Sequence, residues 1–95
     1  MDKYYIQVAE RHYPNLDQVI PLSGCFRTRE DAIENAIDVC RAEKTEYFNL
    51  THMDSTEPGI ILSPDGTHAG VVISAKDCLS EWWYAVKVIE VGFDF

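Results

Sequence analysis

Only one segment of the chain has apolar residues at helical spacing, and this limits the possible folds more than any other feature. From residue 29 to residue 44, small and apolar side chains return every three or four positions, as in an amphipathic helix; they are Ala32, Ile33, Ala36, Ile37 and Cys40. Thr28 is placed to cap this helix, and Glu30 lies in its first turn, where the helix dipole favours a negative charge. The sequence therefore predicts one helix over residues 29–44.

Most of the remaining chain has the patterns of β-strands. Residues 3–10 and 80–91 alternate with period two, so each predicts a strand with two different faces. Pro21 cannot donate a hydrogen bond to a neighbouring strand, so a short strand over residues 18–22 belongs at a sheet edge. Further strands are predicted at 47–53, 59–62 and 70–74, the last two joined by a turn at Ser63-Pro64-Asp65-Gly66-Thr67.

These elements predict a single α+β domain over residues 1–95. We expect a mostly antiparallel sheet of about five to six short strands, with one amphipathic helix packed on one face. The 46% hydrophobic content is that of a globular domain with one core. No apolar run is long enough to cross a membrane, and the first residues lack a secretory pattern, so we expect a cytoplasmic protein.

A lone helix can cover only one face of the sheet, which leaves the other face for a partner. In the last strand we assign one alternating set to the core beneath the helix, namely Trp82, Tyr84, Val86 and Val88. Trp83 belongs to the other set, and we predict that Trp83 and Tyr5 lie on the uncovered face and anchor a partner. The alternative is that the chain itself covers Trp83 with Tyr13, Leu16, Phe93 or Phe95.

The net charge of −8 decides which partners the chain can attract. Nucleic acid and anionic membranes need cationic surfaces, so direct binding to either is disfavoured, and a protein with a basic surface is favoured. Glu30, Glu34 and Asp38 follow one another at four-residue steps and form one acidic stripe on the predicted helix. This stripe either imitates a row of phosphates and steers a basic partner, or is the solvated side of the helix.

No residue pattern in the chain specifies a reaction or a metal site. The three cysteines are odd in number and show no CxxC spacing, and the three histidines form no HxH or HExxH motif. We therefore expect reduced thiols, no cofactor, no metal and no catalytic residues, and we predict that the protein is not an enzyme.

The first functional hypothesis is a small acidic protein-binding module that acts as an inhibitor or decoy on a basic, nucleic-acid-handling protein. Bacteriophage and plasmid anti-defence proteins, and immunity proteins that block nucleases, are proteins of this general type. One alternative is a protein that binds or sequesters a nucleotide or metabolite, with its pocket on the open face or across a homodimer seam. Another is a homodimeric structural protein without a ligand.

Overall fold

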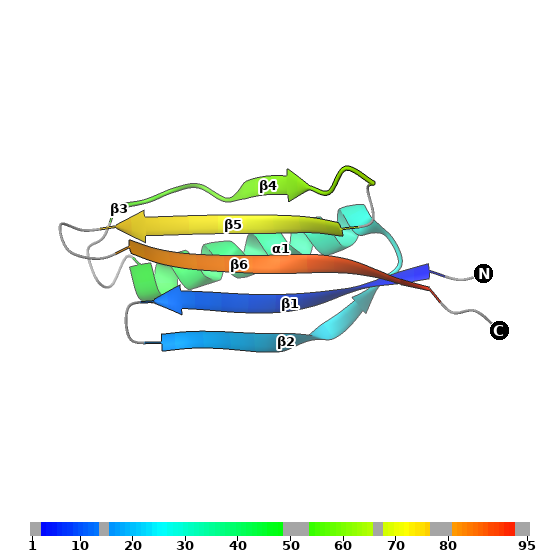
Figure 1. The fold of residues 1–95 in the computed structure, drawn as a ribbon, viewed down its shortest axis with the longest axis horizontal. Coiled ribbons are helices and arrows are strands. Elements are labelled where there is room, and N and C mark those ends of the chain that lie inside the picture. The colour runs from blue at the N-terminus through cyan, green and yellow to red at the C-terminus, as the bar shows by residue number, and fades with distance from the viewer. Residues whose placement is uncertain (1–2, 14–15, 49–53, 66–67, 77–80, 93–95) are drawn as a thin grey trace.

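The computed structural model describes residues 3–13, 16–48, 54–65, 68–76 and 81–92. Their elements follow one another along the chain as shown in Figure 1. In order they are β1 (Lys3–Tyr13), β2 (Leu16–Phe26), α1 (Arg29–Glu43), a π-helical turn η1 (Lys44–Phe48), β3 (Asp54–Ser55), β4 (Gly59–Leu62), β5 (His68–Lys76) and β6 (Glu81–Gly92).

The strands form one antiparallel sheet with the order β2-β1-β6-β5, and both β3 and β4 pair with the far side of β5. The first and last strands, β1 and β6, lie side by side at the centre of the sheet. They pair without interruption from Lys3 opposite Gly92 to His12 opposite Trp83. In Figure 1, α1 lies behind the sheet, where it packs on β1, β2, β5 and β6. The predicted α+β architecture with one helix on one face is confirmed.

The helix begins and ends close to its predicted bounds, because its signals are local. The Thr28 hydroxyl accepts a hydrogen bond from the Asp31 N–H at 3.1 Å and caps the first turn. The predicted strand over 47–53 is wrong at Tyr47 and Phe48, which continue α1 as part of the π-helical turn, and residues 49–53 lie outside the described residues. Phe48 is fully buried there, so packing of its ring accompanies the helical conformation.

Three strands are longer than the sequence predicts. β1, β2 and β5 contain 11, 11 and 9 residues, whereas β6 has its predicted length of 12 residues and is displaced by one position. β2 continues to Phe26 because its register against β1 shifts by a bulge that contains Gly24, at a φ of 144° that favours glycine. Pro21 lies in β2, which pairs only with β1 among the described strands, so the predicted edge position is confirmed.

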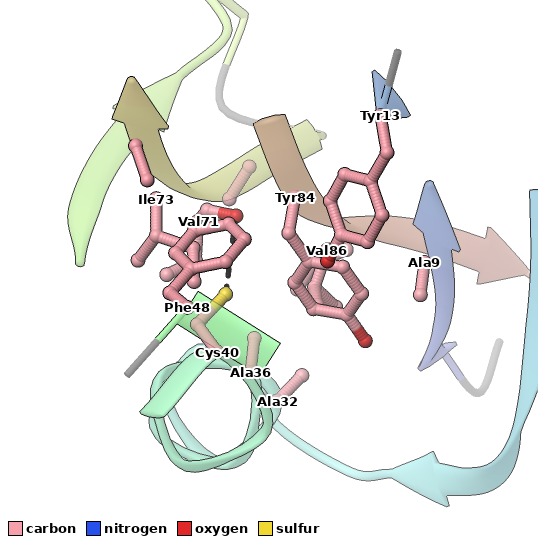
Figure 2. Packing of buried hydrophobic residues seen from close by; sticks show 13 residues of the cluster. Ala9, Tyr13, Ala32, Ala36, Cys40, Phe48, Val71, Ile73, Tyr84 and Val86 are labelled. Atoms are coloured by element: carbon pink, nitrogen blue, oxygen red, sulfur yellow. Dashed lines mark hydrogen bonds between the residues drawn. The ribbon is translucent and has the colours of Figure 1, made fainter. Parts of the chain in front are cut away.

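The core lies between α1 and the helix-facing side of the sheet, as Figure 2 shows. Small residues on the helix let it approach the strands closely, and the Cys40 thiol lies 3.5 Å from the Val71 carbonyl, to which it donates. The core set predicted for the last strand is confirmed, with Tyr84, Val86 and Val88 buried and Trp82 packed against them. None of the helices in the described part of the chain is long and apolar enough to cross a membrane.

Candidate interaction surface

The face of the sheet opposite α1, which we call the open sheet face, has no covering element among the described residues. Strand pairing fixes its membership, because directly opposed residues point to the same side. Its residues are Tyr4, Ile6, Val8, Glu10 and His12 of β1; Glu81, Trp83, Ala85, Lys87, Ile89 and Val91 of β6; His68, Gly70, Val72 and Ser74 of β5; Gly59 and Ile61 of β4; and Asp17, Val19 and Pro21 of β2.

Trp83 is the more exposed of the two aromatic residues on this face, with 47% of it exposed; the other is Tyr4. Trp83 pairs with His12 on one side and Ser74 on the other, so short or polar neighbours leave its indole accessible. Its neighbour Trp82 points the opposite way and stacks on Tyr13, with ring centroids 4.7 Å apart. Tyr13 therefore does not cover Trp83, and Leu16, its partner in β2, lies on the helix-facing side as well. Phe93 and Phe95 lie outside the described residues.

Tyr5 does not lie beside Trp83, and its predicted position on the uncovered face is wrong. It packs against the core cluster on the helix-facing side, two residues before the buried Gln7. The Gln7 side-chain amide donates to the Ala32 carbonyl at 2.7 Å, which fixes this side of β1 against α1. The more apolar side of β1, carrying Ile6 and Val8, is consequently the one left uncovered.

The acidic stripe lies on the opposite side of the molecule from Trp83. Glu30, Glu34 and Asp38 are all exposed on α1, whose buried residues are on the side that faces the sheet. The shortest dimension of the molecule is 21 Å, so a flat partner surface on the open sheet face does not reach this stripe. The structure therefore separates the aromatic and acidic residues that the sequence groups in one site.

The open sheet face carries few charged side chains, although the chain is strongly acidic. Lys87 on β6 bridges to Glu10 on β1 at 3.0 Å, and the His12 ring lies 3.4 Å from the same carboxylate. The hydrogen bond from Lys87 is the main cause that lowers the pKa of Glu10, so this carboxylate stays ionised in the pair. The exposed Asp17 of β2 lies 3.5 Å from the same His12 ring, so the charged groups of this face are clustered around His12 and Glu10.

A shallow groove of about 700 Å³ crosses the open sheet face beside β4. Its floor is mostly aliphatic, with contributions from Ile61, Val72 and Ile89, and Lys87 and His68 add polar groups. This size lies within the range of small-molecule sites, and the apolar floor also suits a protruding side chain of a protein partner.

Sequence reasoning missed a buried ion pair that joins β1 to the end of α1. The Arg11 guanidinium donates to both Glu43 carboxylate oxygens, at 2.8 Å from Nε to Oε1 and 3.0 Å from Nη2 to Oε2. Hydrogen bonds to Glu43 raise the pKa of Arg11. Arg11 and Glu43 are far apart in the sequence, so no local sequence pattern indicates that they pair. The pair is seen only in the folded structure.

The thiols and histidines form no centre that would favour catalysis or metal binding in the described part of the chain. Burial raises the pKa of the Cys40 thiol to about 12, which keeps it protonated, whereas Cys25 is exposed. No group of three histidine, cysteine, aspartate or glutamate side chains lies together among the described residues.

No protein-family model, curated protein or solved structure matches the chain. The site must therefore be interpreted from its own chemistry.

Proposed function

We propose that the protein acts by binding another protein through the open sheet face. The observation that supports this proposal is that β1 and β6 turn apolar side chains, including Ile6, Ile89 and the half-exposed Trp83, to a face that no other described element covers. A contiguous exposed apolar patch on a small domain is typical of an interaction site. Rigid aromatic residues such as tryptophan contribute disproportionately to such interfaces.

The proposed partner has a basic surface, and binding blocks that surface, as in an inhibitor or decoy of a nucleic-acid-handling protein. The net charge of −8 supports this choice, because it attracts cationic surfaces over a distance. Since Glu30, Glu34 and Asp38 lie on the back of α1, we assign them to long-range steering and not to the contact itself. The proposal includes a cytoplasmic location, where the exposed Cys25 thiol stays reduced.

The test is affinity capture from a lysate of the source organism, followed by kinetic measurements with the captured partner. We expect Trp83→Ala to weaken the affinity by about 30-fold, mainly through faster dissociation. We expect Glu34→Lys and added salt to slow association and to leave dissociation nearly unchanged. These two signatures distinguish a contact residue from a steering residue.

The matched control is Leu16→Ala, because Leu16 is 45% exposed but lies on the helix-facing side of the sheet edge. This variant should bind the partner as tightly as the wild-type protein. Equal affinities of the wild-type and Trp83→Ala proteins for every captured partner would contradict the proposal. Capture that is indifferent to salt and to Glu34→Lys would remove its electrostatic part.

The groove beside β4 favours a second candidate, a protein that binds a small molecule. Because its floor is largely aliphatic and Lys87 is already paired with Glu10, an apolar or amphipathic metabolite fits it better than a nucleotide. A ligand that binds only the folded form raises the melting temperature with its concentration. A concentration-dependent rise that Ile89→Lys abolishes would favour this candidate over protein binding.

A further inference from the structure

The strand β4 forms an exposed apolar edge of the sheet. Its three aliphatic residues are each more than half exposed: Ile60 by 51%, Ile61 by 63% and Leu62 by 54%. Among the described strands β4 pairs with β5 alone, and α1 packs on other strands (Figure 1). Sheet edges are usually protected by charges, prolines or bulges, and Gly59–Leu62 contains none of these.

The hydrogen-bonding phase of β4 shows which backbone groups point outward. The Ser63 N–H donates to the His68 carbonyl at 2.9 Å, and the pairing continues through Ile61 opposite Gly70. Residues of an antiparallel strand alternate between hydrogen-bonded and non-hydrogen-bonded positions, so Ile61 is directed to β5 as Ser63 is. The N–H and C=O groups of Ile60 and Leu62 therefore point away from β5, where no described strand accepts them.

Two prolines limit this edge symmetrically. Pro58 and Pro64 lie at equal distances along the sequence on either side of Ile61, and neither has an N–H to donate. Within this edge, only Ile60 and Leu62 can therefore both donate to and accept from an added strand. The sequence around Ile61 is thus self-complementary for an antiparallel neighbour.

We propose that a second copy of this chain pairs with β4, with Ile61 on the twofold axis. In this register Ile60 exchanges two hydrogen bonds with Leu62 of the partner subunit, and Leu62 exchanges two with the partner's Ile60. Opposed residues of paired strands point to one face, so all three aliphatic side chains meet their counterparts. The adjacent registers in phase bring Pro58 opposite Leu62 or Pro64 opposite Ile60, where the proline cannot donate to the opposed carbonyl and Ile61 no longer meets its counterpart.

Charge favours a second copy over the basic partner at this edge. The nearest acids are already engaged, because Lys44 donates to Glu57 at 2.9 Å and Ser63 donates to Asp65 at 2.7 Å. Two copies of net charge −8 repel each other least where the surface is neutral. A four-residue edge buries well under the roughly 1,200 Å² of a stable interface, so the dimer is weak and depends on concentration.

Sedimentation of the full chain over a concentration series up to about 1 mM tests the proposal. We expect the mass to rise from 10.8 kDa toward that of a dimer, and we expect salt to strengthen association by screening the repulsion. Ile61→Lys should weaken association at least about tenfold, because two lysines then face each other on the axis. The matched control, Val19→Lys, makes the same change at a residue of equal exposure on the open sheet face and should have no such effect.

Amide hydrogen exchange provides a readout that does not depend on a variant. The amides of Ile60 and Leu62 should gain protection as the concentration rises, whereas the Ile61 amide, which is directed to β5 in the monomer, should not change. A monomer at every concentration and salt would overturn the proposal, and so would a dimer lost equally in Val19→Lys or Trp83→Ala. If Trp83→Ala loses partner binding but still forms the dimer, both proposals hold. Because partner binding and dimer formation are measured separately, each proposal can fail independently of the other.

Discussion

Glu43 is a buried carboxylate whose partner comes from a distant part of the chain. Arg11 pairs with it and also lies over the Tyr47 and Tyr84 rings, at 5.0 and 5.7 Å from their centroids. The pair fixes the position of the end of α1 against β1. An ion pair of this kind stabilises little relative to an apolar replacement, but breaking it leaves a charge without compensation.

We expect Arg11→Met to lower the free energy of unfolding by about 3 kcal/mol, because the Glu43 charge stays buried and unpaired. Urea denaturation at neutral pH measures this change. The double variant Arg11→Met, Glu43→Leu should recover most of the loss, since it removes both charges together. A double variant no more stable than Arg11→Met would contradict this account.

The stability of the fold should also decline at alkaline pH through Tyr84. Burial, together with the negative charge of Glu43, raises the pKa of Tyr84 to about 12 from an ordinary value near 10. A tyrosine whose pKa is raised by folding contributes its full stabilisation at every pH below its pKa in the unfolded state. This contribution is lost as the pH rises from about 10 to about 12. Urea midpoints should be measured from neutral pH to pH 11.5, a range that extends past the ordinary tyrosine pKa of about 10. With rising pH they should fall more steeply for the wild type than for Tyr84→Phe. Parallel curves for the two proteins would show that another group controls the alkaline decline.

At the scale of elements, α1 depends on signals that are close together in the sequence. The Thr28 cap, the acidic first turn and the spacing of Ala32, Ala36 and Cys40 all lie within one segment, so the helix could be predicted almost residue by residue. The strand predicted over 47–53 failed at Tyr47 and Phe48 because burial of an aromatic ring outweighed their preference for extended structure.

Replacing the cap should test how much that local signal stabilises the fold. Thr28→Ala removes the acceptor of the Asp31 N–H and should lower the free energy of unfolding by about 1 kcal/mol. Thr28→Asp keeps an acceptor and adds a negative charge at the helix N-terminus, so it should unfold at the wild-type urea midpoint or above. Equal midpoints for the alanine and wild-type proteins would mean that the cap does not stabilise the helix.

At the scale of the whole molecule, the structure has two unlike sides. The sequence predicted which residues of β6 face the core, because one of its alternating sets is uninterrupted and apolar. It did not predict the orientation of β1, because Tyr4, Ile6 and Val8 are more apolar than Tyr5, Gln7 and Ala9, and the pattern favours burying the first set. In the structure the register with β6 puts Gln7 and Ala9 opposite the buried Val88 and Val86, and the Gln7 side chain donates to the Ala32 carbonyl.

The separation of the acidic stripe from Trp83 could not be predicted either, since it depends on where the helix lies relative to the sheet. Pairing through β4 would place both open sheet faces on the same side of one continuous sheet, because opposed residues share a face. The proposed dimer would therefore present two binding surfaces in one plane, with both acidic stripes behind them.

The other sheet edge has a different character. On β2, Pro21 lacks a donor and the bulge at Gly24 interrupts the regular spacing of the backbone, so regular edge positions are confined to Leu16–Ile20. The proline and the bulge of β2 thus disfavour the addition of a strand along its second half and leave β4 as the more open margin of the sheet.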